Sequence, residues 1–178
     1  MDIKFVPADL RRLDPFVGEL LVVFVPEDLR PPPGITHALD FRLRGAISRL
    51  LVSAEFSGRL GETAVISPRP YLAFDRLLLM GAGPSSALNP QIYAALIDAV
   101  VRRLGEEGAR RTVIELPGRA LDSIAPELAL DILLERADGD PHLDTWTLVE
   151  SSEVAKRLSV RLRRDRGGGW GANASFPR

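Results

Sequence analysis

Apolar residues along the chain form two alternating patterns, short continuous runs and longer stretches with helical spacing. The runs are rich in Leu, Val and Ile and are bounded by proline, glycine or charged residues, which predicts buried strands. They cover residues 18–25, 62–66, 75–80, 112–116 and 143–149. The stretches with apolar residues three or four positions apart predict amphipathic helices. They cover residues 38–54, 90–107, 123–137 and 152–164.

Local signals mark the ends of two of these helices. Asn89 can cap a helix that begins at Pro90, and Gly108 supplies a stop at its C-terminus. The next helix is expected to be capped by Asp122 or Ser123. Because strands and helices alternate, the chain is predicted to form an α/β fold in which helices connect parallel strands.

Length and composition narrow the class of protein. The 178 residues fit one hydrophobic core, so we expect a single domain over residues 1–165 and a flexible glycine-rich tail over residues 166–178. The chain has no cysteine, which excludes disulfides and cysteine-ligated zinc, and its net charge of -1 offers no general attraction for nucleic acid. It has no signal-peptide pattern and no apolar run of membrane-spanning length, which predicts a cytoplasmic protein without a membrane partner.

Three stretches carry a family resemblance, and they occur in a fixed order. They are Phe56-Ser57-Gly58-Arg59-Leu60-Gly61-Glu62, then Arg76-Leu77-Leu78-Leu79-Met80-Gly81-Ala82-Gly83, then Val113-Ile114-Glu115-Leu116-Pro117. With these stretches, roughly residues 15–150 resemble the N-terminal domain of the leucyl aminopeptidase family, a module akin to macro domains. The resemblance implies a macro-domain-like, three-layer α/β/α fold with a mixed, mostly parallel sheet.

The same resemblance implies that the chain is not an enzyme. In that family the chemistry belongs to a separate C-terminal domain, in which Asp, Glu and Lys hold two metal ions around a signature of the Asn-Thr-Asp-x-Glu-Gly-Arg kind. Nothing in this sequence matches that signature. We therefore expect no catalytic residue, no metal ligand and no cofactor.

One loop is the best candidate for a ligand site. Residues 81–86 follow a buried strand and precede a helix, where backbone amides can hold an anion at the carboxyl edge of a sheet. The candidate residues, including two after the next strand, are Gly81, Gly83, Ser85, Ser86, Gly118 and Arg119. However, Pro84 removes one donor and Ser86 replaces the third glycine of a dinucleotide fingerprint. A plain connection between strand and helix is therefore the favoured interpretation of this loop.

Two further sets of residues have the chemistry to bind an anion or a metal ion. Arg157, Arg161 and Arg164 share one face of the last predicted helix and are candidates for nucleic-acid phosphates, although a solvated outer face is favoured. The only histidines, His37 and His142, lie far apart in sequence, and surface or capping roles are favoured over a metal site.

The sequence thus leaves three functions open. The favoured one is a non-catalytic module for protein interaction, assembly or regulation, acting through a protein partner or self-association. The second is a macro-like binder of a nucleotide or ADP-ribose-type anion, and the third and least favoured is nucleic-acid binding through the last helix.

Overall fold

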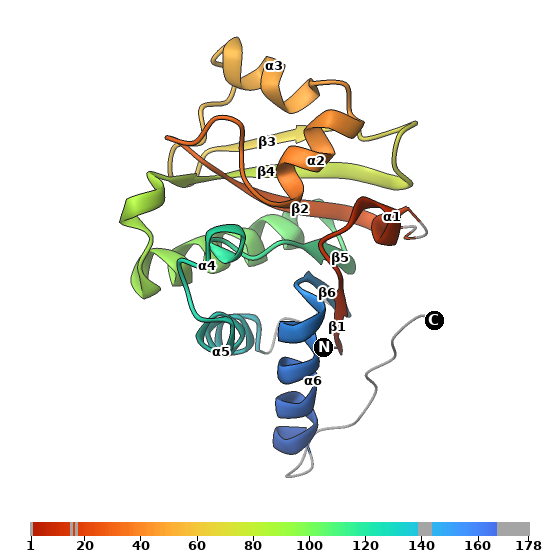
Figure 1. Cartoon of the computed structure of the whole chain (residues 1–178), viewed down its shortest axis with the longest axis vertical. Coiled ribbons are helices and arrows are strands. Elements are labelled where there is room, and N and C mark those ends of the chain that lie inside the picture. The colour runs from red at the N-terminus through yellow and green to blue at the C-terminus, as the bar shows by residue number, and fades with distance from the viewer. Residues whose placement is uncertain (1, 15, 17, 139–143, 167–178) are drawn as a thin grey trace.

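The computed structural model describes residues 2–14, 16, 18–138 and 144–166 (Figure 1). Its strands are β1 (Asp2–Val6), β2 (Gly18–Pro26), β3 (Thr63–Ile66), β4 (Phe74–Gly83), β5 (Arg111–Ile114) and β6 (Thr145–Val149). Its α-helices are α1 (Leu10–Leu13), α2 (Ile35–Arg42), α3 (Ala46–Val52), α4 (Pro90–Glu107), α5 (Pro126–Ala137) and α6 (Ser152–Arg166). Two short 3₁₀ turns, η1 (Ser85–Ala87) and η2 (Arg119–Leu121), follow β4 and β5. Apart from Arg166, the predicted tail lies outside the described residues, as does His142.

The six strands form one sheet in the order β1-β6-β5-β2-β4-β3. Every neighbouring pair is parallel except β3 and β4, which are antiparallel. From β2 the chain passes through α2 and α3 to β3 and β4, which lie on one side of β2. It then crosses back through α4 to β5, on the other side of β2. The carboxyl ends of β2, β4 and β5 therefore surround the point at which the strand order reverses, which is where open α/β sheets bind ligands.

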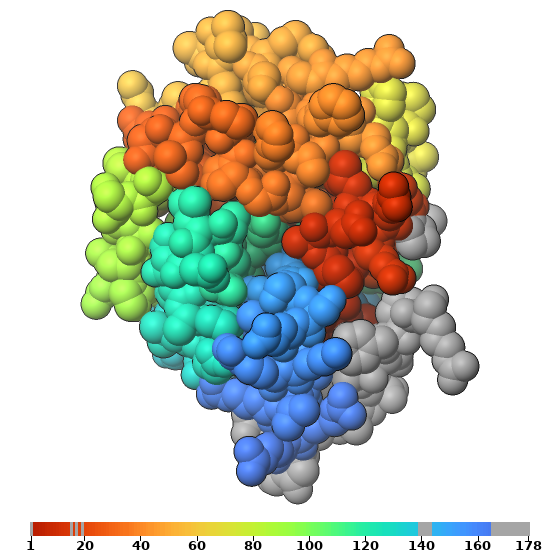
Figure 2. Space-filling view, viewed as in Figure 1, coloured from red at the N-terminus to blue at the C-terminus, as the bar shows by residue number. Residues whose placement is uncertain are grey.

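The buried side chains of the sheet alternate between two helical layers. Leu20, Val22 and Phe24 of β2 pack with α4, α5 and α6, whereas Leu21 and Val23 pack with α1, α2 and α3. A strand buried on both faces reads as a continuous apolar run, which explains the sequence of β2. The prediction of a three-layer α/β/α fold with a mostly parallel sheet is confirmed. In the space-filling view, α2 and α3 lie at one end of the molecule and α6 lies at the other (Figure 2).

The structure corrects the predicted helix over residues 38–54, which is two helices. Arg44 and Gly45 have φ angles of 54° and 76° and separate α2 from α3. The buried carboxylate of Asp40 accepts hydrogen bonds from the amides of Ile47 and Ser48, at 2.8 and 3.0 Å, and so caps α3. The apolar spacing continues across the break because both helices bury the same side against the sheet.

Two other boundaries also differ from the prediction. The strand β1, which pairs with β6 from Asp2 to Val6, was not predicted. Helix α5 begins at Pro126 with Ala125 as its N-cap, because residues 119–121 form η2 and Asp122 has a φ of 50°. Asp122 and Ser123 therefore do not cap α5. Over the described residues, no helix combines the length and apolar character required to cross a bilayer.

Candidate functional site

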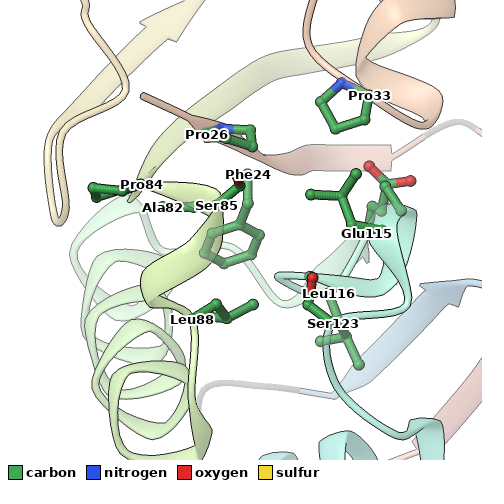
Figure 3. A pocket seen from close by; sticks show the side chains of 13 residues that line it. Phe24, Pro26, Pro33, Ala82, Pro84, Ser85, Leu88, Glu115, Leu116 and Ser123 are labelled. Carbon is green, nitrogen blue, oxygen red and sulfur yellow. The ribbon is translucent and has the colours of Figure 1, made fainter. Parts of the chain in front are cut away.

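A small cavity lies at the carboxyl ends of β2, β4 and β5, where the strand order predicts a ligand site (Figure 3). Its apolar lining includes Phe24, Ala82, Leu88 and Leu116, and its volume is about 30 Å³. A water molecule needs roughly 10–15 Å³ of such space. Pockets for small organic ligands span about 300–1,000 Å³. The cavity can therefore hold one or two water molecules but no nucleotide.

The turn over residues 58–62 lies directly against the end of β4, and its carbonyl groups accept hydrogen bonds from the amides of the glycines in β4. The amide of Gly81 donates to the carbonyl of Glu62 at 2.7 Å, and that of Gly83 donates to the carbonyl of Gly58 at 2.9 Å. A Cβ atom at Gly81 would lie 1.9 Å from the carbonyl oxygen of Arg59. Position 81 therefore requires glycine, because the backbone of Gly58 and Arg59 occupies the space that a side chain would need. Both candidate amides are bound within the chain.

The carboxylate of Glu62 holds this turn together. Its Oε2 atom accepts from the hydroxyl of Ser57 at 2.7 Å and from the amides of Ser57, Gly58 and Arg59 at 2.9, 3.0 and 3.2 Å. The bond from the Ser57 hydroxyl is the main cause that holds the pKa of Glu62 below its usual value. Successive amides that converge in this way form a nest for an anion. Here the nest is filled by the chain's own acid.

A second internal carboxylate occupies the donors of Ser85. The amide and hydroxyl of Ser85 donate to Oδ1 and Oδ2 of Asp28, each at 2.8 Å. These bonds, the one from the Ser85 amide first, lower the pKa of Asp28. The neighbouring Ser86 is exposed. The Asp28 carboxylate therefore stands where a bound anion would meet the loop.

Arg119 is also bound within the chain. Its Nε donates to Oε1 of Glu150 at 2.6 Å, and its Nη1 donates to the carbonyl of Ile124 at 2.8 Å. Both side chains of the pair are nearly fully buried, at 6% and 5% exposure. This ion pair connects η2 with the residue that follows β6.

Leu88 lines the cavity and packs against Gly118. A Cβ atom at Gly118, whose φ is 74°, would lie 2.2 Å from Cδ2 of Leu88. The leucine thus packs directly on the glycine. The structure brings Ser85, Leu88 and Gly118 to the lining of one cavity. That lining does not include Gly81, Gly83, Ser86 or Arg119.

Glu115 lines the cavity and was not among the predicted site residues. It is buried at the end of β5 and its Oε1 atom accepts from the amide of Ile35 at 3.1 Å. Burial is the main cause that raises the pKa of Glu115 to about 7, and the charge of Glu150 adds to it, whereas the bond from Ile35 lowers it. In Figure 3, the Glu115 carboxyl group points toward the loop that carries Pro33. The signal in the sequence was an acid at the end of an apolar run.

The candidate arginines of α6 lie beside acids of α5. Arg157 forms an ion pair with Glu127 and Arg161 with Asp131, both at 2.6 Å. Arg164 is exposed. Two of the three candidate phosphate contacts thus have carboxylate neighbours that reduce their attraction for an anion.

Of the two histidines named as metal-site candidates, His37 lies within the described residues and His142 does not. His37 is exposed on α2. Within residues 2–14, 16, 18–138 and 144–166, no group of three or more His, Cys, Asp or Glu side chains is arranged to hold a metal ion.

Comparison with known proteins links this chain to the aminopeptidases. Residues 22–136 match the family model described as the N-terminal domain of the cytosol aminopeptidase family. The "Probable cytosol aminopeptidase" of Alkaliphilus oremlandii is 28% identical over 123 residues, which are 68% of this chain and 24% of that protein. The chain thus spans about a quarter of the length of this relative.

Solved structures show the same fold at low sequence identity. A mutant of tomato leucine aminopeptidase superposes with a TM-score of 0.61 and 19% identity, over 93% of this chain and 37% of that one. A Trypanosoma brucei macrodomain in complex with ADP-ribose superposes with a TM-score of 0.68 and 15% identity, over 90% of this chain and 68% of that one. The predicted likeness to macro domains is confirmed for the fold.

The contact at Gly81 predicts a large loss of stability for Gly81→Ala. The added Cβ meets backbone, which cannot rotate away, so the turn must separate from β4 and the free energy of unfolding should fall by about 3 kcal/mol. Gly105→Ala is the matched control, because its Cβ meets nothing within 4 Å in α4, and it should raise stability by about 0.5–1 kcal/mol. Urea denaturation measures both, and a similar small effect for the two variants would contradict the contact.

The buried acid Glu115 predicts a pH dependence of stability. Its pKa is about 7 in the folded protein against a usual 4.5, so the folded state keeps a proton that the unfolded chain releases. The stabilisation is complete below about pH 4.5 and is lost as the pH rises through about 7, on the order of 2–3 kcal/mol. Glu115→Gln, which keeps an acceptor for Ile35, should remove this part of the pH dependence.

Urea denaturation at about pH 5 and about pH 8 measures the effect of Glu115. Glu135→Gln, a change of an exposed side chain on α5, is the control and should follow the wild-type pH dependence. Equal pH dependence in the wild type and Glu115→Gln would show that Glu115 does not titrate in this range.

Proposed function

Since this chain belongs to the family of the N-terminal domain of the cytosol aminopeptidases, we propose that it is a non-catalytic module that acts through protein contacts, in assembly or regulation. The matched region is the N-terminal domain alone. The name of the A. oremlandii relative, a cytosol aminopeptidase, favours a cytoplasmic location.

The carboxyl ends of β2, β4 and β5 form a crevice around the small cavity described above. The observation that carries this proposal is that groups of the chain itself fill this crevice. Asp28 occupies the donors of Ser85, and Leu88 lies on Gly118. What remains is a cavity of about 30 Å³. A site for a small organic ligand is largely formed before binding and is at least tenfold larger. The geometry therefore favours a function that does not use the crevice.

The distribution of exposed apolar side chains supports a surface for protein contacts. Among the described residues, seven large hydrophobic side chains are exposed, and four of them come from one stretch of 25 residues between positions 41 and 65. They are Phe41, Val52, Leu60 and Val65. Single exposed apolar residues are common, whereas a contiguous exposed apolar patch is typical of an interaction surface. Of these four residues, Val52 lines one groove with Ile66, the neighbour of Val65 in β3.

A second candidate function is binding of a nucleotide or ADP-ribose-type anion at Gly81, Gly83, Ser85, Ser86, Gly118 and Arg119. The observation that favours it is the likeness to the T. brucei macrodomain, which was solved in complexes with ADP-ribose and with ADP. In this chain such binding would require Asp28 and Leu88 to move away. Nucleic-acid binding through Arg157, Arg161 and Arg164 stays the least favoured function, because α5 supplies acids beside α6.

A thermal-shift experiment separates the first two functions. Wild-type protein with about 1 mM ADP-ribose or ADP should keep its melting temperature, because the crevice is closed. A ligand with a Kd of about 10 µM would add about 2.7 kcal/mol and raise the melting temperature by several degrees. Pyrophosphate at the same concentration controls for a general effect of anions. A rise with ADP-ribose alone would replace the proposed function by the second candidate.

A hydrolysis assay tests the non-catalytic character. The purified chain, supplied with zinc or manganese, should release no leucine from leucine amide above the buffer background, because the residues expected for that chemistry have no counterpart in the sequence. A full-length leucine aminopeptidase serves as the positive control. Turnover that persists through purification and stops with a chelator would overturn the proposal.

A further inference from the structure

The edge strand β3 differs from the other edge of the sheet in what it presents. Among the described strands, β3 pairs with β4 alone, so one side of its backbone has no strand partner. Its sequence is Thr63-Ala64-Val65-Ile66, without charge, proline or glycine. The opposite edge, β1, carries Lys4 and Asp2. Charged side chains protect an edge from pairing with another strand, and β3 lacks this protection.

Apolar side chains flank the edge of β3 on both faces of the sheet. Val65 is 39% exposed on one face. On the other face, Ile66 lines an open groove of about 650 Å³ together with Leu50 and Val52 of α3. Val52 is 87% exposed. In Figure 1, α3 lies beside β3 at one end of the molecule. A strand added to this edge would cover Val65 with one set of alternate side chains and the groove with the other.

From this edge we infer that β3 binds the β3 strand of a second copy of the chain, in antiparallel pairing about a two-fold axis perpendicular to the sheet. This inference rests on the proposed function as a protein-interaction module. Such an interface is isologous, so each copy offers the same edge and the same groove. The two sheets would become one continuous sheet, with both α3 helices on the same face.

The charges at the groove suit a second copy. Arg49 and Glu55 are both exposed and line the groove. Arg49 lies at the middle of α3, and its Nη1 donates to the carbonyl of Arg44, before the N-terminus of the helix, whereas Glu55 follows the C-terminus. A two-fold axis between the two β3 strands, level with Ala64 or Val65, reverses direction along the strand, so the Arg49 guanidinium of one copy lies toward the Glu55 carboxylate of the other. Opposite charges across an interface favour association and fix its register. The net charge of -1 on each chain adds little repulsion.

The association state of the purified chain tests this inference. Sedimentation equilibrium over about 1–200 µM should show a monomer–dimer equilibrium for the wild type. Val65→Lys places a charge on the edge and should weaken dimerisation at least tenfold. Val160→Lys adds the same charge to an exposed site on α6, 55% exposed, and should leave the dimer unchanged. Circular dichroism checks that both variants are folded.

Cysteine cross-linking locates the interface without a disruptive charge. Because the natural sequence has no cysteine, a single introduced cysteine can form a disulfide only between two copies. In a two-fold antiparallel pair the residue at the axis faces its own copy at about 4.5–5.5 Å between Cα atoms, within reach of a disulfide. Ala64→Cys or Val65→Cys should therefore cross-link under mild oxidation, whereas Val160→Cys should not.

Three outcomes would overturn the inference. They are a wild-type chain that stays monomeric at the highest concentration, a dimer that Val65→Lys leaves intact, and cysteines at positions 64 and 65 that both cross-link no more than a cysteine at position 160. None of them contradicts the proposed function, because a module for protein contacts can bind a different protein. The proposed function fails on ADP-ribose binding or on hydrolysis, which are measured separately.

Discussion

The close contact between Gly81 and the carbonyl of Arg59 is the constraint on which the crevice edge of this molecule depends. Without a side chain at position 81, the turn over residues 58–62 can pair with the end of β4 as if it extended β3. The contact places Glu62 where its carboxylate gathers the amides of the turn. Two of the stretches that carry the family resemblance are therefore the two sides of one backbone contact, which explains why they occur together.

Carboxylates of the chain itself bind the donors around this edge. Glu62 takes the amides of the turn, Asp28 takes the amide and hydroxyl of Ser85, and Glu150 takes the guanidinium of Arg119. Asp28 and Glu150 follow β2 and β6, at the carboxyl edge where open α/β sheets bind ligands, and Glu62 fills a nest of amides beside the end of β4. The donors are thus satisfied in the absence of ligand, and an anion from solvent would have to displace a carboxylate that is already held nearby.

Much of the fold was predictable because most strands are buried on both faces and read as apolar runs. The missed strand β1 alternates Asp2 and Lys4 with Ile3 and Phe5, a half-buried pattern that a search for apolar runs does not detect. The break between α2 and α3 depends on Asp40, whose capping role requires Ser48 to fold back onto it, eight residues later. Apolar spacing alone cannot show such a break, since it reports which side is buried and not where the backbone turns.

The place of the candidate residues in the fold was predictable, but their contacts were not. The sequence placed glycines and serines at the carboxyl edge of the sheet, and the structure has them there. It could not show that Arg59 lies on Gly81, that Leu88 lies on Gly118 or that Asp28 reaches Ser85, because these partners are between 22 and 57 residues away. Glu115 was hidden for the same reason, since its raised pKa follows from burial under a loop that precedes it by 80 residues.

The closed crevice and the open edge have opposite energetic consequences for binding. A ligand that used the donors of Ser85 would have to break both bonds to Asp28, and one that approached Gly118 would have to displace Leu88. Its affinity would be reduced by the free energy of that change. A strand that pairs with β3 meets backbone groups and apolar side chains that are already exposed, so its binding requires no such opening. Low-identity likeness to an ADP-ribose-binding macrodomain reports the arrangement of the layers, whereas function depends on these local contents. On this balance, the proposed association through the β3 edge requires less rearrangement of the chain than binding in the crevice.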